Sequence, residues 1–173
     1  MEHEPKIESR AEQPYVGIAA KAGNEAEVRG AVDRSFPELF GWFASHGIDP
    51  AGPPFIRYLE LSHEGQPLRF ELGVPTEAGP DADGPVQAGT LPAGRYLTYL
   101  HVGPYTHAEV PDLHDARSLV AAWAAREGVT LESAATPRGT AFEANVEHYR
   151  TDASREPDWS RWETELAVLI ARR

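Results

Sequence analysis

The residues best suited to bind a ligand or catalyse a reaction lie near the C-terminal end of this sequence. Apolar and polar residues alternate over residues 142–149, as in a strand with one covered face, so Glu147 and Tyr149 share a side. A polar loop containing a proline follows, and Trp162 then precedes a second strand-like run over residues 163–170. A carboxylate, a phenol and an indole can therefore meet on one sheet surface. Such a surface suits an apolar or cationic small molecule.

Two kinds of chemistry follow from a carboxylate that lies among aromatic rings. Loss of hydration costs such a group several kcal/mol unless hydrogen bonds, proton uptake or a cation offset it. A lipophilic cation would pair with Glu147 and contact the rings through cation–π interactions, each worth about 0.5–1 kcal/mol at exposed sites. Alternatively, Glu147 would act as a general base on water while a tyrosine stabilises the developing anion. The first chemistry predicts a binding protein, which we favour, and the second a hydrolase.

The residues alone also allow structural roles for these side chains. The alternative for Glu147 is a solvated strand position paired with a neighbouring arginine. Trp42 and Trp123 lie beside the apolar stripes of predicted helices and are expected in the core, although Trp42 can reach a ligand cleft from one side. Histidines and acidic residues crowd the chain near Asp112 but match no zinc spacing, so we expect helix capping there, with no metal and no cofactor.

Composition excludes several classes of function. The chain has 173 residues and a formal net charge of −11, without a cluster of Lys or Arg, so we expect no direct contact with nucleic acid. No apolar run approaches the roughly 18 residues of a membrane span, and the acidic N-terminus does not resemble a signal peptide, which predicts a cytoplasmic protein. Because there is no cysteine, disulfides and thiolate catalysis are excluded.

The elements that must position the site repeat along the chain. The first half is predicted as strand, helix, strand, strand, at residues 13–21, 25–46, 54–61 and 67–74. The second half follows the same order, at residues 87–102 with an interruption at residues 91–94, then 112–127, 142–149 and 163–170. Both helices end with a Trp, four further residues, a Gly and a β-branched residue, which indicates a duplicated unit. Two such units predict pseudo-symmetric halves with a ligand cleft at their junction.

These elements define one domain with two halves. We expect residues 1–12 to form a disordered or extended tail and residues 13–173 to form the domain. The halves are residues 13–75 and 86–173, joined over residues 76–85 by a connector rich in Gly, Pro and Asp. The predicted fold class is α+β, with curved antiparallel sheets and a helix covering one face of each half.

Pro37 complicates the first helix. Proline inside a helix removes a hydrogen bond, so it either kinks one long helix or occupies the first turn of a second helix. Ser35 and Glu38 would form the capping box of that second helix. We favour a single, kinked helix.

Four segments of the chain share their order and spacing with a known family. They are PPFIRYLEL at residues 53–61, LPAGRYLTYLHVGPY at 91–105, AAWAAREGV at 121–129, and VEHYRTD with DWSRWETELAVLI between 146 and 170. Together they resemble the GyrI-like small-molecule-binding domain, which is also the effector-binding domain of multidrug-responsive transcription regulators. The resemblance covers nearly everything after residue 13. It implies a duplicated α+β fold with an aromatic-lined pocket between the halves and an acidic residue at its base.

The resemblance also implies roles for particular residues. The family's glutamate corresponds to Glu147, and the aromatic positions of the matching motifs correspond to Tyr58, Tyr105, Tyr149 and Trp162. The implied function is binding of a lipophilic aromatic molecule or drug, a cation being one option, for sequestration or resistance. Some GyrI-like proteins are hydrolases that open the cyclopropane ring of DNA-alkylating compounds. That alternative makes Glu147 the general base and Tyr105 its catalytic partner.

Two further implications concern partners. No helical DNA-binding module precedes the matching segments, so we expect a standalone domain without direct control of transcription. A separate regulator or gyrase partner is left open. A haem-binding family of similar architecture makes a tetrapyrrole binder a third option, with His101 or His148 as an axial ligand.

Overall fold

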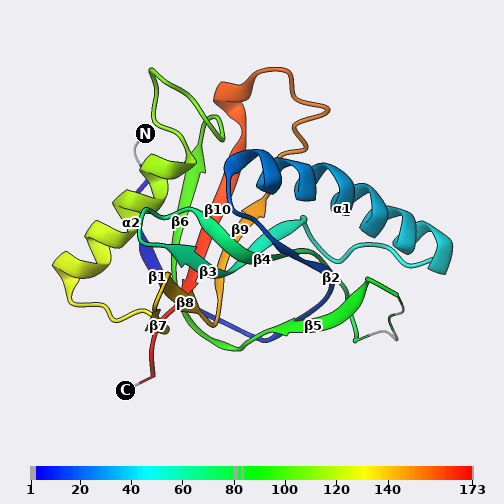
Figure 1. Cartoon of the computed structure of the whole chain (residues 1–173), viewed down its shortest axis with the longest axis horizontal. Helices are drawn as coiled ribbons and strands as arrows, with labels where there is room; N and C mark the ends of the chain where they lie inside the picture. The colour runs from blue at the N-terminus through cyan, green and yellow to red at the C-terminus, as the bar shows by residue number, and fades with distance from the viewer. Residues whose placement is uncertain (1–2, 80–81, 83, 173) are drawn as a thin grey trace.

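The computed structural model describes residues 3–79, 82 and 84–172, and places two helices against a continuous antiparallel sheet (Figure 1). The helices are α1 (Glu25–His46) and α2 (Leu113–Glu127), with a short 3-10 turn, η1 (Trp159–Arg161). The strands are β1 (Lys6–Arg10), β2 (Gln13–Lys21), β3 (Phe55–Ser62), β4 (Pro67–Pro75), β5 (Gln87–Leu91), β6 (Gly94–Val102), β7 (Ser133–Thr136), β8 (Gly139–Phe142), β9 (Asn145–Tyr149) and β10 (Glu163–Leu169).

Helix α1 is a single helix that continues through Pro37. The side chain of Asn24 caps its first turn by accepting a hydrogen bond from the backbone N–H of Glu27. Gly47 ends it in the left-handed conformation, with φ of 63°, which glycine adopts without steric cost. Ser35 is buried within the helix, so the alternative of a second helix that starts there is wrong.

Helix α2 begins at the acidic cluster near residue 112. Asp112 accepts a hydrogen bond from the backbone N–H of Asp115, and the Asp115 side chain accepts one from the backbone N–H of Asp112. The expected capping is therefore confirmed. Across the residues that the structure describes, no three His, Asp or Glu side chains are grouped closely enough to hold a metal ion. Over the same part of the chain, neither helix has a stretch long and apolar enough to span a bilayer.

The order of strands shows the predicted pseudo-twofold arrangement. It reads β1-β6-β10-β9-β3-β4-β2-β5, so β9 and β3 pair at the centre and the two halves extend outward from them in matching order. The separate sheets expected for the two halves are thereby joined into one. The outermost strands are exchanged, because β1 pairs with β6 of the second half and β5 pairs with β2 of the first.

Three local details differ from the sequence expectations. Residues 6–10, expected within a tail, form β1, which pairs along its whole length with β6. The predicted strand over residues 142–149 is divided, because β8 and β9 pair with different parts of β3. A short strand, β7, was not predicted and forms a hairpin with β8. The connector at residues 76–85 lies partly outside the described residues.

The two helices lie over different halves of the sheet (Figure 1). Residues of α1 pack with β2, β3 and β4 in one apolar cluster, and residues of α2 pack with β6 and β10 in another. A third cluster contains Tyr15, Phe55, Tyr96 and Val146 and lies on the opposite face of the sheet. Because both faces are covered, adjacent residues of β9 are buried on opposite sides, and Glu147 is on the side of the helices.

Candidate functional site

Glu147 is the centre of the candidate site. It lies on β9 and is almost completely buried, with 1% of the residue exposed. The hydroxyl groups of Tyr58 and Tyr149 both donate hydrogen bonds to its Oε2 atom, at 2.9 and 2.8 Å. Its Oε1 atom accepts a hydrogen bond from Nη1 of Arg117 on α2. A buried carboxylate is costly unless donors compensate it, and three donors do so here. We call these four residues the carboxylate site.

Arg117 gives the carboxylate site an internal counter-ion. Its side chain is 29% exposed, whereas that of Glu147 is 2% exposed. Burial acts to lower the pKa of Arg117, but the Glu147 carboxylate more than offsets it, so this pKa lies above its usual value. The guanidinium is therefore fully charged. The alternative role for Glu147 is a solvated position paired with an arginine. The pairing with an arginine is correct, but Glu147 is buried and not solvated, because α2 covers this part of β9.

Four aromatic side chains adjoin the carboxylate site, and we call them the aromatic cover: Phe36, Tyr105, Tyr149 and Trp162. The ring of Tyr149 lies edge-on to Phe36 of α1 and to Tyr105, with centroids 6.4 and 5.5 Å apart. Tyr105 in turn lies against Trp162, with centroids 4.7 Å apart. All four are only partly buried. The cover thus joins α1, the loop before α2 and the loop before β10 around β9.

Backbone contacts fix the two loops of the aromatic cover. The N–H of Gly103 donates to the carbonyl oxygen of Trp162 at 2.8 Å, and the carbonyl oxygen of Tyr105 accepts from the N–H of Leu113. The indole N–H of Trp162 donates to the carbonyl oxygen of Glu156 at 2.9 Å. Tyr105 and Trp162 are therefore tied to each other's loops and to the start of α2.

The tyrosines at this site retain their protons. Burial first, and then the charge of Glu147, raise the pKa of Tyr58 and of Tyr149 well above the usual value. Burial, with Asp152 and Glu147, also raises the pKa of Tyr105. All three phenols are therefore hydrogen-bond donors at neutral pH.

One buried polar atom beside the site has no hydrogen-bond partner within the described residues. This is the hydroxyl of Thr164, which is fully buried and lies opposite Tyr149 in the pairing of β9 with β10. Side chains directly opposite each other on paired strands share a face. Thr164 therefore lies on the helix side of the sheet, beside Tyr149.

Five of the six residues assigned to ligand binding from the sequence come together here: Tyr58, Tyr105, Glu147, Tyr149 and Trp162. Trp42 is instead buried in the core cluster of α1, where its ring stacks on His46 with centroids 4.1 Å apart. The core role considered for it is the one that its burial favours.

The two histidines considered as axial ligands have other surroundings. Nε2 of His101 lies 3.0 Å from the carbonyl oxygen of Pro104. His148 follows Glu147 on β9 and faces the other side of the sheet, where its ring lies 5.6 Å from that of Phe55. His148 therefore lies on the face away from the aromatic cover, and one ring nitrogen of His101 is engaged by a backbone carbonyl group.

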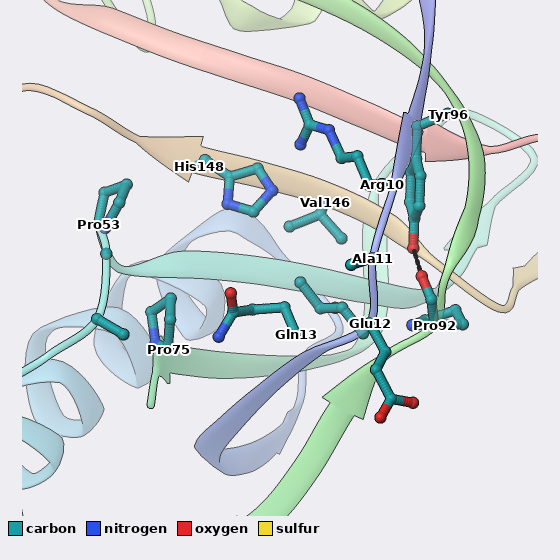
Figure 2. A pocket seen from close by; sticks show the side chains of 13 residues that line it. Arg10, Ala11, Glu12, Gln13, Pro53, Pro75, Pro92, Tyr96, Val146 and His148 are labelled. Carbon is teal, nitrogen blue, oxygen red and sulfur yellow. Dashed lines mark hydrogen bonds between the residues drawn. The ribbon is translucent and has the colours of Figure 1, made fainter. Parts of the chain in front are cut away.

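A cavity of about 410 Å³ lies on the side of the sheet away from the helices (Figure 2). Its walls include Pro53, Pro75, Val146 and His148. Burial first, opposed by Glu165 and aided by Arg10 and Arg150, lowers the pKa of His148 to about 4. The histidine is therefore uncharged at neutral pH.

Arg117 and Phe36 are the site residues that sequence reasoning missed. Phe36 was counted among the apolar residues of its helix and not as a ligand contact. Arg117 follows Ala116 on the core-facing stripe of α2 and lies four residues after Leu113. A charged residue at such a position is a signal for a buried partner.

A model of the GyrI-like small-molecule-binding domain matches residues 3–168, and the chain belongs to this family. Among curated proteins, none has a matching sequence.

Solved structures of similar fold include those of three proteins. The EcmrR C-terminal domain matches with a TM-score of 0.71 at 14% identity, with both chains covered completely. The longer EcmrR chain in an EcmrR–DNA complex matches with a TM-score of 0.75, and the present chain spans 58% of its length. SAV2435 bound to tetraphenylphosphonium and a hydrolase from Listeria innocua match with TM-scores of 0.57 and 0.59, each at 14% identity. The match to SAV2435 covers 97% of this chain and 94% of that chain, and the match to the hydrolase covers 98% and 93%. At such identity they establish the fold alone.

Proposed function

We propose that this protein binds a lipophilic aromatic small molecule against the carboxylate site, with the rings of the aromatic cover as the contact surface. The observation that carries the proposal is a buried carboxylate with three donors beneath four partly exposed rings. These rings come from four separate segments, namely α1, the loop before α2, β9 and the loop before β10. Sequestration of a drug or toxin is the corresponding biological role.

The aromatic cover is suited to admitting a flat molecule. Its rings touch edge-on or tilted, an arrangement in which each neighbouring pair contributes about 0.5–1.5 kcal/mol. A ligand ring inserted between two of them would replace one such contact by two. Tyr105 and Trp162 are on loops whose backbones are held by hydrogen bonds, so a ligand would be admitted by rotation of their side chains.

A fluorescent probe tests this function. We expect N-phenylnaphthylamine, an uncharged aromatic dye that brightens in apolar surroundings, to bind saturably. Tyr105→Leu and Trp162→Leu should each weaken binding about tenfold, the equivalent of about 1.4 kcal/mol, because each removes one aromatic wall. Tyr96→Phe is the matched control, since Tyr96 lies on the other face. Equal weakening by all three variants, or no saturable binding, would contradict the proposal.

Hydrolysis is the second candidate function. Glu147 is buried beside phenols that keep their protons, which is an arrangement for general acid–base chemistry. One structural neighbour is described as a hydrolase. In a cyclopropane substrate, water oxygen would bond to a ring carbon while Glu147 takes the proton. The electrons of the broken C–C bond would pass to a conjugated carbonyl, and Tyr105 would donate a hydrogen bond to the resulting enolate.

Turnover separates hydrolysis from binding. Three of the roughly four acceptor positions of the Glu147 carboxylate are already occupied, so we favour binding. If hydrolysis occurs, mass spectrometry of a cyclopropane-bearing alkylator should show addition of water with many turnovers. Glu147→Gln should then reduce the rate by about 10²–10⁴ while binding persists. Unchanged compound recovered from a tight complex would leave binding as the function.

A further inference from the structure

Arg117 pairs with the buried carboxylate of Glu147. We infer that its guanidinium is a built-in counter-ion for Glu147, so that the site selects uncharged aromatic compounds with a carbonyl-type acceptor over lipophilic cations. This inference rests on the proposed function and specifies the ligand class. It follows from the symmetry of the two halves and from the hydrogen bonds of Arg117.

Strand registers identify the position equivalent to Glu147. Tyr15 of β2 pairs with Pro75, and Tyr96 of β6 pairs with Leu169, so β2 matches β6 and β4 matches β10. Leu72 of β4 pairs with Ile56, and Leu166 of β10 pairs with Glu147, which makes Ile56 the equivalent of Glu147. Ile56 and Glu147 also pair with each other, so the pseudo-twofold axis passes between them.

The tyrosines of the carboxylate site are equivalent to each other. Tyr58 lies two residues after Ile56, as Tyr149 does after Glu147. The two hydroxyl groups thus approach the axis from opposite halves and meet on one carboxylate oxygen. The axis has a single carboxylate, because the first half supplies isoleucine.

The helices extend the comparison to Arg117. Gly47 and Gly128 end α1 and α2 in the same conformation and with the same pattern of backbone bonds. At the same sequence distance before these glycines lie Phe36 and Arg117. The first half therefore has an apolar pair, Phe36 and Ile56, where the second half has an ion pair.

The ion pair changes what the carboxylate can recognise. Oε1 of Glu147 is bonded to a guanidinium, and Oε2 accepts from two hydroxyl groups, so an incoming cation gains little unless it displaces Arg117. It would also be repelled by the guanidinium at close range. Arg117 has five N–H donors, and among the described residues only Nη1 has a partner, which is Glu147. The remaining donors suit a ligand carbonyl oxygen.

Two probes of matched shape test this inference. N-methylacridone is uncharged and has a carbonyl group, whereas N-methylacridinium is a permanent cation with the same ring system. We expect the wild-type protein to bind the acridone at least about tenfold more tightly, measured by fluorescence titration. Arg117→Met keeps the apolar stem and removes the charge, so it should strengthen acridinium binding about ten- to hundredfold and weaken acridone binding.

Two control variants complete the experiment. Arg117→Lys keeps the charge and should still exclude the cation. Arg117→Met with Glu147→Gln removes both charges and should bind the two probes with similar affinity. Thermal unfolding by circular dichroism verifies that each variant is folded. If Arg117→Met alone does not fold, the double variant is used to compare the two probes in the absence of the Arg117 charge.

The outcomes distinguish this inference from the proposed function. If wild-type protein prefers the acridinium and Arg117→Met does not alter this preference, the role of Arg117 is overturned. The proposed binding function is then still supported. Absence of saturable binding by both probes, in wild type and all folded variants, would overturn the binding function and this inference together.

Discussion

The two halves of this molecule have the same architecture but different chemistry. In the first half, the positions nearest the pseudo-twofold axis hold Phe36 and Ile56, and in the second they hold Arg117 and Glu147. The tyrosines that flank the axis are present in both halves. Duplication therefore supplied two phenols that converge on one point, and a single pair of charges makes that point a polar site.

The comparison shows how a symmetric fold acquires an asymmetric site. A second carboxylate at the position of Ile56 would lie directly across the strand pair from Glu147, where like charges are destabilising. One carboxylate with one counter-ion leaves no excess charge at the axis. The following experiments test this asymmetry, beginning with the largest expected effect.

Glu147→Ile, which copies the first half, should have the largest effect on stability. It leaves Arg117 partly buried without its partner and should lower the free energy of unfolding by about 3–4 kcal/mol, measured by urea denaturation. Adding Arg117→Phe copies the first half completely and should recover at least about 1 kcal/mol beyond additivity. Strictly additive losses would mean that the two charges are not coupled.

His148 should make stability depend on pH. It follows Glu147 as Arg57 follows Ile56, so His148 and Arg57 are equivalent positions of the two halves. The pKa of His148 is about 4 in the folded protein, compared with an ordinary value of 6.5. Between these two pH values the unfolded chain binds a proton at His148 and the folded chain does not. Stability from this group is complete above pH 6.5 and falls as the pH decreases to about 4. We expect wild type to lose about 2–3 kcal/mol more than His148→Asn across this range. Parallel pH profiles for the two proteins would contradict this.

The equivalent tyrosines should not contribute equally. Tyr58 is buried with 4% exposed, whereas Tyr149 is partly exposed, so water can replace the lost hydrogen bond more readily at Tyr149. Tyr58→Phe should cost about 2 kcal/mol and Tyr149→Phe about 1 kcal/mol, by chemical denaturation. The reverse order would show that factors other than burial determine how much each hydroxyl group contributes to the free energy of unfolding.

The helix caps should show the smallest difference. Asn24→Ala removes one capping bond from α1, whereas Asp112→Ala removes half of a reciprocal capping box from α2. Each should lower the melting temperature through a loss of about 1 kcal/mol, and the loss at Asp112 should be larger by a few tenths. Differential scanning calorimetry measures both, and a larger loss at Asn24 would oppose this order.

Much of the fold could be predicted from local patterns. The bounds of β2 and α1 follow from alternation, helical spacing and the glycine at residue 47, all of which act within a few residues. The division of β8 from β9 could not be predicted. Between Arg57 and Glu60 on β3, the pairing register shifts, and Glu143 with Ala144 have no place in the ladder. That irregularity depends on the partner strand.

The candidate site was predictable in part for the same reason. Glu147 and Tyr149 share a face through local alternation, and the resemblance to a family placed Tyr58, Tyr105 and Trp162 beside them. Arg117 lies 30 residues before Glu147 and reaches it only because α2 packs across the sheet. Sequence periodicity assigns a residue to a face, but it does not identify the partner on that face.

The exchanged outer strands bear on how the chain folds. The first strand of each half completes the sheet of the other, through the pairings of β1 with β6 and of β5 with β2. Each half therefore depends on a strand from outside it for its outer hydrogen bonds, in addition to the central pairing of β3 with β9. The protein should consequently unfold in one cooperative step rather than half by half, and the central pair of strands should have the slowest amide exchange.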